Sequence, residues 1–245
     1  MKVAGSSDTV HYIKMDAIEK TGVAHAGYTL KEKWTYRFIA RELGIPPEMT
    51  VHPKEIHGCK VEMVSSSVNG GEGTIRSSSL TDVDSVITDE PGFALCLIVS
   101  DCAAVYMVDP VKRCIGLAHS GREGTKMNIV AATVDKMSAC YGTDPEDVVA
   151  AISPCICRSC YEVDPVTAQE FVSCFRKGWR ETVFEERNGR YFLDIAAAIS
   201  LQLREAGIHQ IQMPEYCTCH NEAFFSYRRE GNDDSNAAWL MITKK

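Results

Sequence analysis

Three short apolar runs between positions 92 and 118 most constrain the fold of this chain. They read GFALCLIVS at 92–100, AVYMV at 104–108 and CIGLA at 114–118, and Asp, Gly or Pro residues separate them from their neighbours. Apolar segments this short, placed between turn residues, are typical of strands that are buried on both faces rather than of helices. We therefore predict three buried strands in this part of the chain.

Helical patterns alternate with these strands. Apolar residues recur at helical spacing in four segments, and one more short apolar run reads as a strand. The helical segments are 31–43, 125–140, 164–177 and 194–206, and the further strand is 148–152. The last two helices each open with an Asp, a natural N-cap, and Gly207 supplies a natural stop. The interleaving indicates an α/β or α+β chain, and no true linker divides it, so we expect a single domain over 1–245.

Composition and charge narrow the class of protein. Hydrophobic residues make up 45% and charged residues 24% of the chain, as in ordinary globular proteins. A formal net charge of −7 argues against nucleic acid or an anionic membrane as the main partner. No apolar run is long enough to span a bilayer, and the N-terminus has no signal-peptide core. The chain has 11 cysteines, an odd number, so we expect reduced thiols and a cytoplasmic location. We also expect a monomer or small homo-oligomer.

Three side chains of the kind that bind metals stand at or near the ends of apolar runs. They are His57 in EIHGCKV, Cys102 in SDC and His119 in AHSG, and we expect them to meet at one edge of a sheet. Two imidazoles and a thiolate leave a fourth tetrahedral position open, which is the pattern of a catalytic zinc site. Asp101 or another carboxylate would orient a ligating imidazole. A Cys102–His119 nucleophile and base, or satisfied structural residues, are the alternatives.

A second group of cysteines lies in the C-terminal half. Cys155, Cys157 and Cys160 form C-x-C-x-x-C, and Cys217, Cys219 and His220 form C-x-C-H far downstream. Together these residues offer enough ligands for a structural zinc ion, and packed reduced thiols are the alternative.

Longer motifs carry a resemblance to a known family. The stretch DSVITDEPGFALCLIVSDCAAVYMVDPVKRCIGLAHSGREGT at 84–125 resembles the core of the laccase-domain family, also called the multicopper polyphenol oxidoreductase family. Three further segments match in the same order along the chain. They are VHPKEIHG at 51–58, SPCICRSCYEV at 153–163 and CTCHNEAFFSYRREG at 217–231.

The resemblance implies a fold, an activity and a cofactor. The family fold is a layered αββα arrangement, similar to the catalytic domain of a bacterial cytotoxic necrotizing factor, a cysteine deamidase. The family activity is phosphorolysis of adenosine, inosine and related purine nucleosides, together with adenosine deamination. The family zinc ligands fall on His57, Cys102 and His119. Copper is less expected than zinc, because a multicopper oxidase needs many histidines and this chain has 7.

The implied substrates are a purine nucleoside and phosphate, and arginine suits phosphate because its planar fork binds two oxygens. Our candidates for substrate and phosphate binding are Arg228, Arg229, Arg122 and Ser226.

This chain also departs from the family pattern. The family motif H-A-G-W-R-G reads HSGREG at 119–124, so Glu123 stands where the family has arginine. A carboxylate there is expected to repel phosphate unless Arg122 compensates. Glu55 replaces a family glutamine, and Asn236 ends a segment in which the family arginine is missing. These departures favour weakened phosphate use, and they leave open a degenerate member that binds a nucleoside without turnover.

Overall fold

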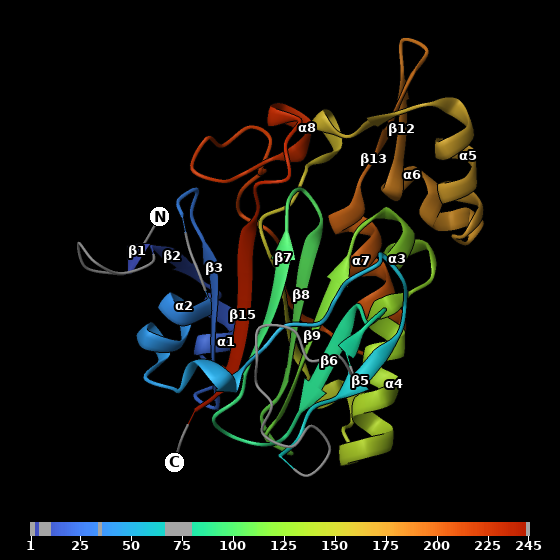
Figure 1. Cartoon of the computed structure of the whole chain (residues 1–245). Helices are drawn as coiled ribbons and strands as arrows, with labels where there is room; N and C mark the ends of the chain where they lie inside the picture. Colours follow the sequence, from blue (N-terminus) through green and yellow to red (C-terminus); the bar gives the residue numbers. More distant parts are fainter. Residues whose placement is uncertain (1–2, 5–10, 34–35, 67–79, 244–245) are drawn as a thin grey trace.

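The computed structural model describes residues 3–4, 11–33, 36–66 and 80–243 of the chain (Figure 1). Its centre is a pair of six-stranded sheets. The first sheet has the order β1 (Val3–Ala4), β2 (Tyr12–Lys14), β3 (Ala24–Thr29), β15 (Asn236–Ile242), β7 (Ala94–Val99), β4 (Thr50–Val51). The second has the order β14 (Gln210–Gln212), β10 (Val149–Ile152), β8 (Ala103–Asp109), β9 (Cys114–Ser120), β6 (Ser85–Thr88), β5 (Val61–Met63). Both sheets mix parallel and antiparallel pairs.

Helices and a small third sheet complete the described structure. The helices are α1 (Asp16–Glu19), α2 (Tyr36–Leu43), α3 (Arg122–Lys126), α4 (Ile129–Tyr141), α5 (Pro165–Ser173), α6 (Arg180–Val183), α7 (Ile195–Glu205) and α8 (Tyr227–Glu230). The third sheet has the order β11 (Glu162–Val163), β13 (Arg190–Leu193), β12 (Phe184–Arg187). Among the described residues, no helix combines the length and the apolar content needed to cross a membrane.

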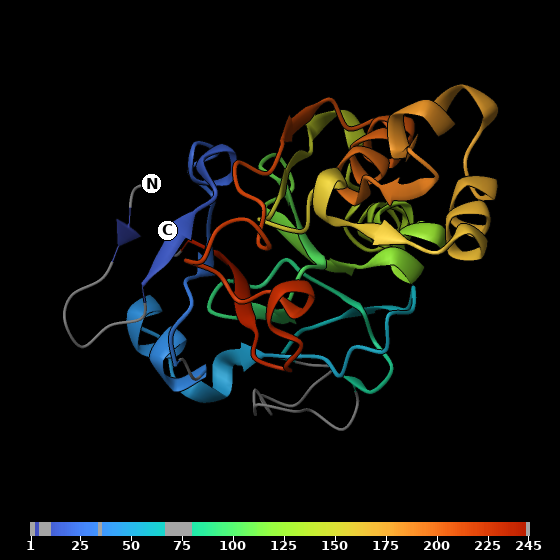
Figure 2. The same ribbon diagram turned by 90° about the horizontal axis from the view of Figure 1, so that it is seen from above.

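Three buried apolar clusters show how the layers are stacked. The largest lies between the inner faces of the two sheets and includes Leu97 of β7 and Leu117 of β9. A second packs α4 and α7 onto the outer face of the second sheet, and a third packs α2 onto the outer face of the first. Figures 1 and 2 show the resulting helix–sheet–sheet–helix order. The predicted layered αββα fold of mixed α/β class is confirmed.

The predicted strands are confirmed with small shifts of their ends. β7, β8, β9 and β10 occupy the four apolar runs, and β9 extends to Ser120, two residues past its predicted end. The extension matters because it places His119 inside the strand. There it pairs with Ala104 of β8 in an antiparallel register.

The helices differ more from the prediction. The expected helix at 125–140 is two helices, because Asn128 takes a left-handed φ of 58° and caps α4 by accepting the backbone N–H of Ala131. The helix predicted at 31–43 is α2, which begins at Tyr36, and residues 34–35 lie outside the described part of the chain. Asp164 and Asp194 cap α5 and α7 as predicted, although α5 ends early, at Ser173.

Candidate metal centre and pocket

The candidate metal ligands lie where the chain crosses from the first sheet to the second. His57 is on the connection from β4 to β5, and Cys102 is on the short turn from β7 to β8. His119 comes from β9, beside β8 in the second sheet. The three side chains therefore meet between the ends of two sheets. Our expectation that they meet at the edge of one sheet is wrong, because strands joined by these two connections belong to different sheets.

Both crossings need an unusual backbone conformation. His57 and Asp101 have positive φ angles of 62° and 72°, which are uncommon for residues other than glycine. The carboxylate of Asp84 holds the first crossing by accepting the backbone N–H groups of His57 at 2.8 Å and Gly58 at 2.7 Å. Strained backbone conformations of this kind are common at functional sites, where contacts with the surrounding structure maintain them.

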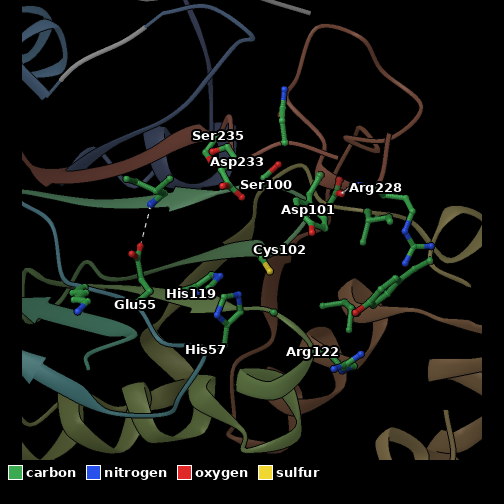
Figure 3. Close-up of a pocket in the computed structure, with 18 of the residues that line it drawn as sticks. Glu55, His57, Ser100, Asp101, Cys102, His119, Arg122, Arg228, Asp233 and Ser235 are labelled. Atoms are coloured by element: carbon green, nitrogen blue, oxygen red, sulfur yellow. Dashed lines mark hydrogen bonds between the residues drawn. The ribbon is translucent and has the colours of Figure 1, made fainter. Parts of the chain in front are cut away.

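The three predicted ligands converge. The donor atoms of His57, Cys102 and His119 all lie within 4.8 Å of one another. The two imidazole rings are 4.7 Å apart between centroids, and the sulfur of Cys102 lies beside them (Figure 3). A Cβ atom on Gly121 would lie 2.6 Å from Cys102 Sγ, so glycine is required for the thiol to occupy this place.

Asp84 orients the inner imidazole. Its Oδ1 lies 3.1 Å from Nδ1 of the buried His119, which turns the other ring nitrogen, Nε2, away from this carboxylate. Asp101 makes no such contact among the described residues. Its carboxylate instead accepts the Thr218 hydroxyl and the backbone N–H of Arg228. We expected Asp101 or another carboxylate to orient a ligating imidazole, and the carboxylate that does so is Asp84, which stands at the start of a buried strand.

The titration of Cys102 and His119 reflects their contact. Burial raises the pKa of the Cys102 thiol, but hydrogen bonds and charges from His119 and His57 outweigh it and bring the pKa to about 6. Burial lowers the pKa of His119, but hydrogen bonds to Asp84 and Cys102 raise it to about 10. Without a metal, the pair is a thiolate beside an imidazolium near neutral pH, so metal binding must release the imidazole proton.

A pocket of about 620 Å³ opens over these three residues. Ile98, Ile156, Tyr161 and Tyr227 supply apolar and aromatic wall, a lining suited to a flat organic ring. Figure 3 shows Glu55 on one side of Cys102, with Arg122 and Arg228 on the other.

The structure separates the four candidate phosphate-binding residues. Arg122 and Arg228 line the pocket, whereas Arg229 and Ser226 are not among its lining residues. The Arg229 guanidinium donates to the backbone carbonyls of Thr218 and Phe224, among others. Ser226 is the N-cap of α8 and accepts the backbone N–H of Arg229. The geometry thus gives Arg229 and Ser226 a part in holding the C-terminal loop.

Glu123 neutralises its neighbour instead of facing the pocket. Its carboxylate lies 2.9 Å from Arg122 Nε and 3.1 Å from Lys126 Nζ, and it is not a lining residue. Asn236 is also outside the lining, buried with its side-chain amide on the backbone of Phe225. Glu123 can therefore affect the pocket through Arg122, which lines it, whereas Asn236 contacts the backbone of Phe225 and Val99.

Glu55 is a pocket residue that the sequence marked only as a departure from the family. Its Oε1 accepts the backbone N–H of Ile98 at 3.0 Å, shown dashed in Figure 3. Burial raises the pKa of this carboxyl above its usual value. Its Oε2 lies 3.7 Å from Nε2 of the buried His52, so contacts on both oxygens hold this carboxyl in place.

The fold and the site define a layered α/β protein with a Cys/His metal-binding group at the mouth of a pocket. The model of the family described as "Multi-copper polyphenol oxidoreductase laccase" matches residues 32–243, and this chain belongs to that family. A purine nucleoside phosphorylase of Streptomyces coelicolor is 32% identical over 203 residues, which cover 83% of this chain and 79% of that protein.

Two solved structures have the same fold as this chain. The crystal structure of YlmD from Geobacillus stearothermophilus has a TM-score of 0.81 at 26% identity and covers 99% of both chains. The protein YfiH of Bacillus licheniformis shares the fold, with a TM-score of 0.83 at 23% identity over 98% of this chain and 99% of that one.

The donor chemistry of the pocket fits one metal ion of intermediate softness. Two imidazoles and one thiolate are typical zinc ligands, and three protein ligands leave one coordination position for water or substrate. Gly121 leaves the space that the Cys102 sulfur occupies, and Asp84 orients His119. Both features are expected of a preorganised metal site.

Proposed function

We propose that this chain is a zinc-dependent purine nucleoside phosphorylase that also deaminates adenosine, with weakened affinity for phosphate. The observation that carries the proposal is the convergence of His57, Cys102 and His119 at a pocket lined by Arg122 and Arg228. The similarity to proteins named purine nucleoside phosphorylase supports the substrate class.

Phosphorolysis needs groups that bind phosphate, and deamination needs a group that activates water; the pocket residues can supply both. In phosphorolysis a phosphate oxygen attacks C1′ of the ribose as the bond to the purine breaks, and the products are the free base and ribose 1-phosphate. Arg122 and Arg228 would hold the phosphate as bidentate donors. In deamination water attacks C6 of adenine and ammonia leaves. Zinc held by His57, Cys102 and His119 would supply Lewis-acid activation of water.

Residues in the pocket wall would bind the nucleoside. Tyr161 and Tyr227 offer aromatic surface for the purine, and Glu55 offers a hydrogen-bonding partner on the opposite side from the arginines. All 11 cysteines are free, which supports a reducing compartment such as the cytoplasm as the working environment.

Weakened phosphate use follows from the pairing of Arg122. Its guanidinium donates a hydrogen bond to Glu123, whose negative charge partly offsets that of the arginine. Arg228 directs one nitrogen to the backbone carbonyls of Cys160 and Glu162, which leaves fewer donors for an anion. We therefore expect phosphorolysis to need high phosphate, whereas deamination requires no anion.

Product analysis tests the proposal. The zinc-loaded chain is incubated with adenosine or inosine, with and without phosphate, and the products are separated by chromatography. We expect adenine or hypoxanthine only with phosphate, and inosine from adenosine under both conditions. Absence of every product from a zinc-loaded chain would favour a binding protein without turnover.

A second candidate, a cysteine hydrolase, rests on the lowered pKa of Cys102 and its contact with His119. Hydrolysis of an amide by a metal-free chain, lost in Cys102→Ser, would favour this candidate over the phosphorylase.

A further inference from the structure

A second cluster of metal-type ligands lies outside the pocket. The Sγ atoms of Cys157, Cys160 and Cys217 and a ring nitrogen of His220 lie within 4.8 Å of one another. These residues form two pairs, C-x-x-C at 157–160 and C-x-x-H at 217–220. We propose that they bind a structural zinc ion that fastens the 153–161 segment to the 216–228 segment, independently of the pocket chemistry.

The donor set matches structural zinc. Three thiolates and one imidazole complete a tetrahedron, and such sites use cysteine pairs separated by two to four residues. Zn–S bonds of about 2.3 Å place tetrahedral donors roughly 3.8 Å apart. The donor atoms, all within 4.8 Å of one another, need small adjustments to reach this geometry. His220 Nδ1 lies 3.6 Å from Cys157 Sγ and its Nε2 lies 3.1 Å from Cys160 Sγ, so the ring must turn to direct one nitrogen at the ion.

Backbone contacts hold the cluster in place before any ion binds. Cys155 and Cys217 form a parallel β-bridge, and Thr218 N donates to Cys155 O at 3.1 Å. Cys217 Sγ accepts the backbone N–H of Cys157 at 3.3 Å. Hydrogen bonds from amides to sulfur stabilise the thiolate form that binds metal.

The neighbouring cysteines are excluded by position. Cys155 is buried, 2% exposed, in the apolar cluster beneath the second sheet. Cys219 is not part of the four-residue group, but its thiol is in hydrogen-bonding reach of Cys160, so substituting it would disturb a proposed ligand. Cys140 of α4 offers the control, because it is a free and exposed cysteine that is not part of the group.

The fastened segments support the pocket. Thr218, next to Cys217, donates to Asp101, and Ile156 N donates to Asp101 O at 3.0 Å. Asp101 precedes Cys102 and has the positive φ that turns the chain between the sheets. A zinc ion at the second cluster would thus restrain the turn that carries Cys102.

Cobalt titration of a chain without the pocket imidazoles tests the site. The His57→Ala/His119→Ala chain is reduced and titrated with Co²⁺, whose tetrahedral thiolate complexes absorb strongly in the visible and near ultraviolet. We expect one equivalent to bind with the thiolate charge-transfer band of three sulfurs, and Zn²⁺ to bleach it. Failure of the phosphorylase proposal would not change this result, because both pocket imidazoles are absent and the remaining Cys102 thiolate cannot give a band of three sulfurs.

Added substitutions in that background identify the ligands. Cys217→Ser should weaken Co²⁺ binding by roughly a hundredfold or more and reduce the charge-transfer intensity, and Cys140→Ser should change neither. If Cys217→Ser does not fold, His220→Gln, at an exposed side chain, should show the same loss of affinity while the band of three sulfurs remains. No visible band in the fully reduced background chain, or an equal loss in Cys140→Ser, would overturn the proposal. A disulfide among these cysteines under reducing conditions would also overturn it.

Discussion

The carboxylate of Asp84 links the backbone and the chemistry of the pocket. It is buried, and it accepts the backbone N–H groups of His57 and Gly58 as well as contacting His119 Nδ1. Burial raises its pKa, but hydrogen bonds from His119 and from the backbone N–H groups of Gly58 and Ile56 outweigh burial and hold the pKa below its usual value. A single side chain therefore sets the position of one imidazole and the orientation of the other.

Asp84→Asn should lower metal affinity about 10–100-fold, because an amide would place its NH₂ group against N–H donors and would orient His119 less firmly. Metal affinity is measured by competition with a chelator of known affinity, and circular dichroism reports folding. Asp82→Asn is the control, since Asp82 is exposed and its left-handed φ of 61° suits asparagine. Equal affinity in both variants would remove Asp84 from the metal site.

Glu123→Gln should lower the phosphate concentration needed for half-maximal phosphorolysis. Releasing Arg122 from an exposed ion pair is worth about 0.2–1 kcal/mol, a change of up to roughly fivefold. Deamination should change little, because it uses no anion. Glu170→Gln is the control, since Glu170 contacts Lys126 but does not line the pocket. An unchanged phosphate dependence in Glu123→Gln would show that Arg122 does not bind phosphate.

The connecting turns are the elements that make the site. Gly121, at the start of α3, passes so close to Cys102 that no larger residue fits without moving the sulfur. Gly121→Ala should therefore fold and lose the pocket metal in dialysis, which elemental analysis would measure as about one equivalent less than the native chain retains. Gly178→Ala is the control, since nothing lies within 4 Å of a Cβ there. Full metal retention in Gly121→Ala would show that Cys102 is not a ligand.

Sequence patterns predicted where the strands lie in the chain better than they predicted which sheet each strand joins. Short apolar runs located β7 to β10, because a strand with two buried faces leaves little choice of residue type. They did not reveal that β7 and β8, joined through 100–102, belong to different sheets, because this depends on the positive φ of Asp101. Asp84 was missed for a similar reason. Its role depends on contacts with residues 26–35 positions away, which no local pattern encodes.

At the scale of the molecule, the two metal groups tie together segments distant in sequence. His57, Cys102 and His119 join connections of both sheets, and the second cluster joins the 153–161 and 216–228 segments. A ligand that binds only the folded state stabilises it, by about 2.7 kcal/mol when its concentration is a hundred times Kd.

Removal of metal should therefore lower the melting temperature. For a chain of this length each kcal/mol corresponds to about 2–4 °C, so loss of one site should lower Tm by roughly 5–11 °C. Calorimetry before and after chelation measures the change, and zinc should restore it where magnesium does not. An unchanged Tm in a chain shown by elemental analysis to have lost its metal would contradict a stabilising role.

In the proposed function, deamination of adenosine depends on metal held by His57, Cys102 and His119. It is tested by the rate of inosine formation from adenosine by native, metal-stripped and zinc-restored chain, beside Cys102→Ala. We expect activity to vanish on stripping, to return with zinc, and to be absent from Cys102→Ala under every condition. Full activity in a stripped chain that contains no measurable metal would contradict the account.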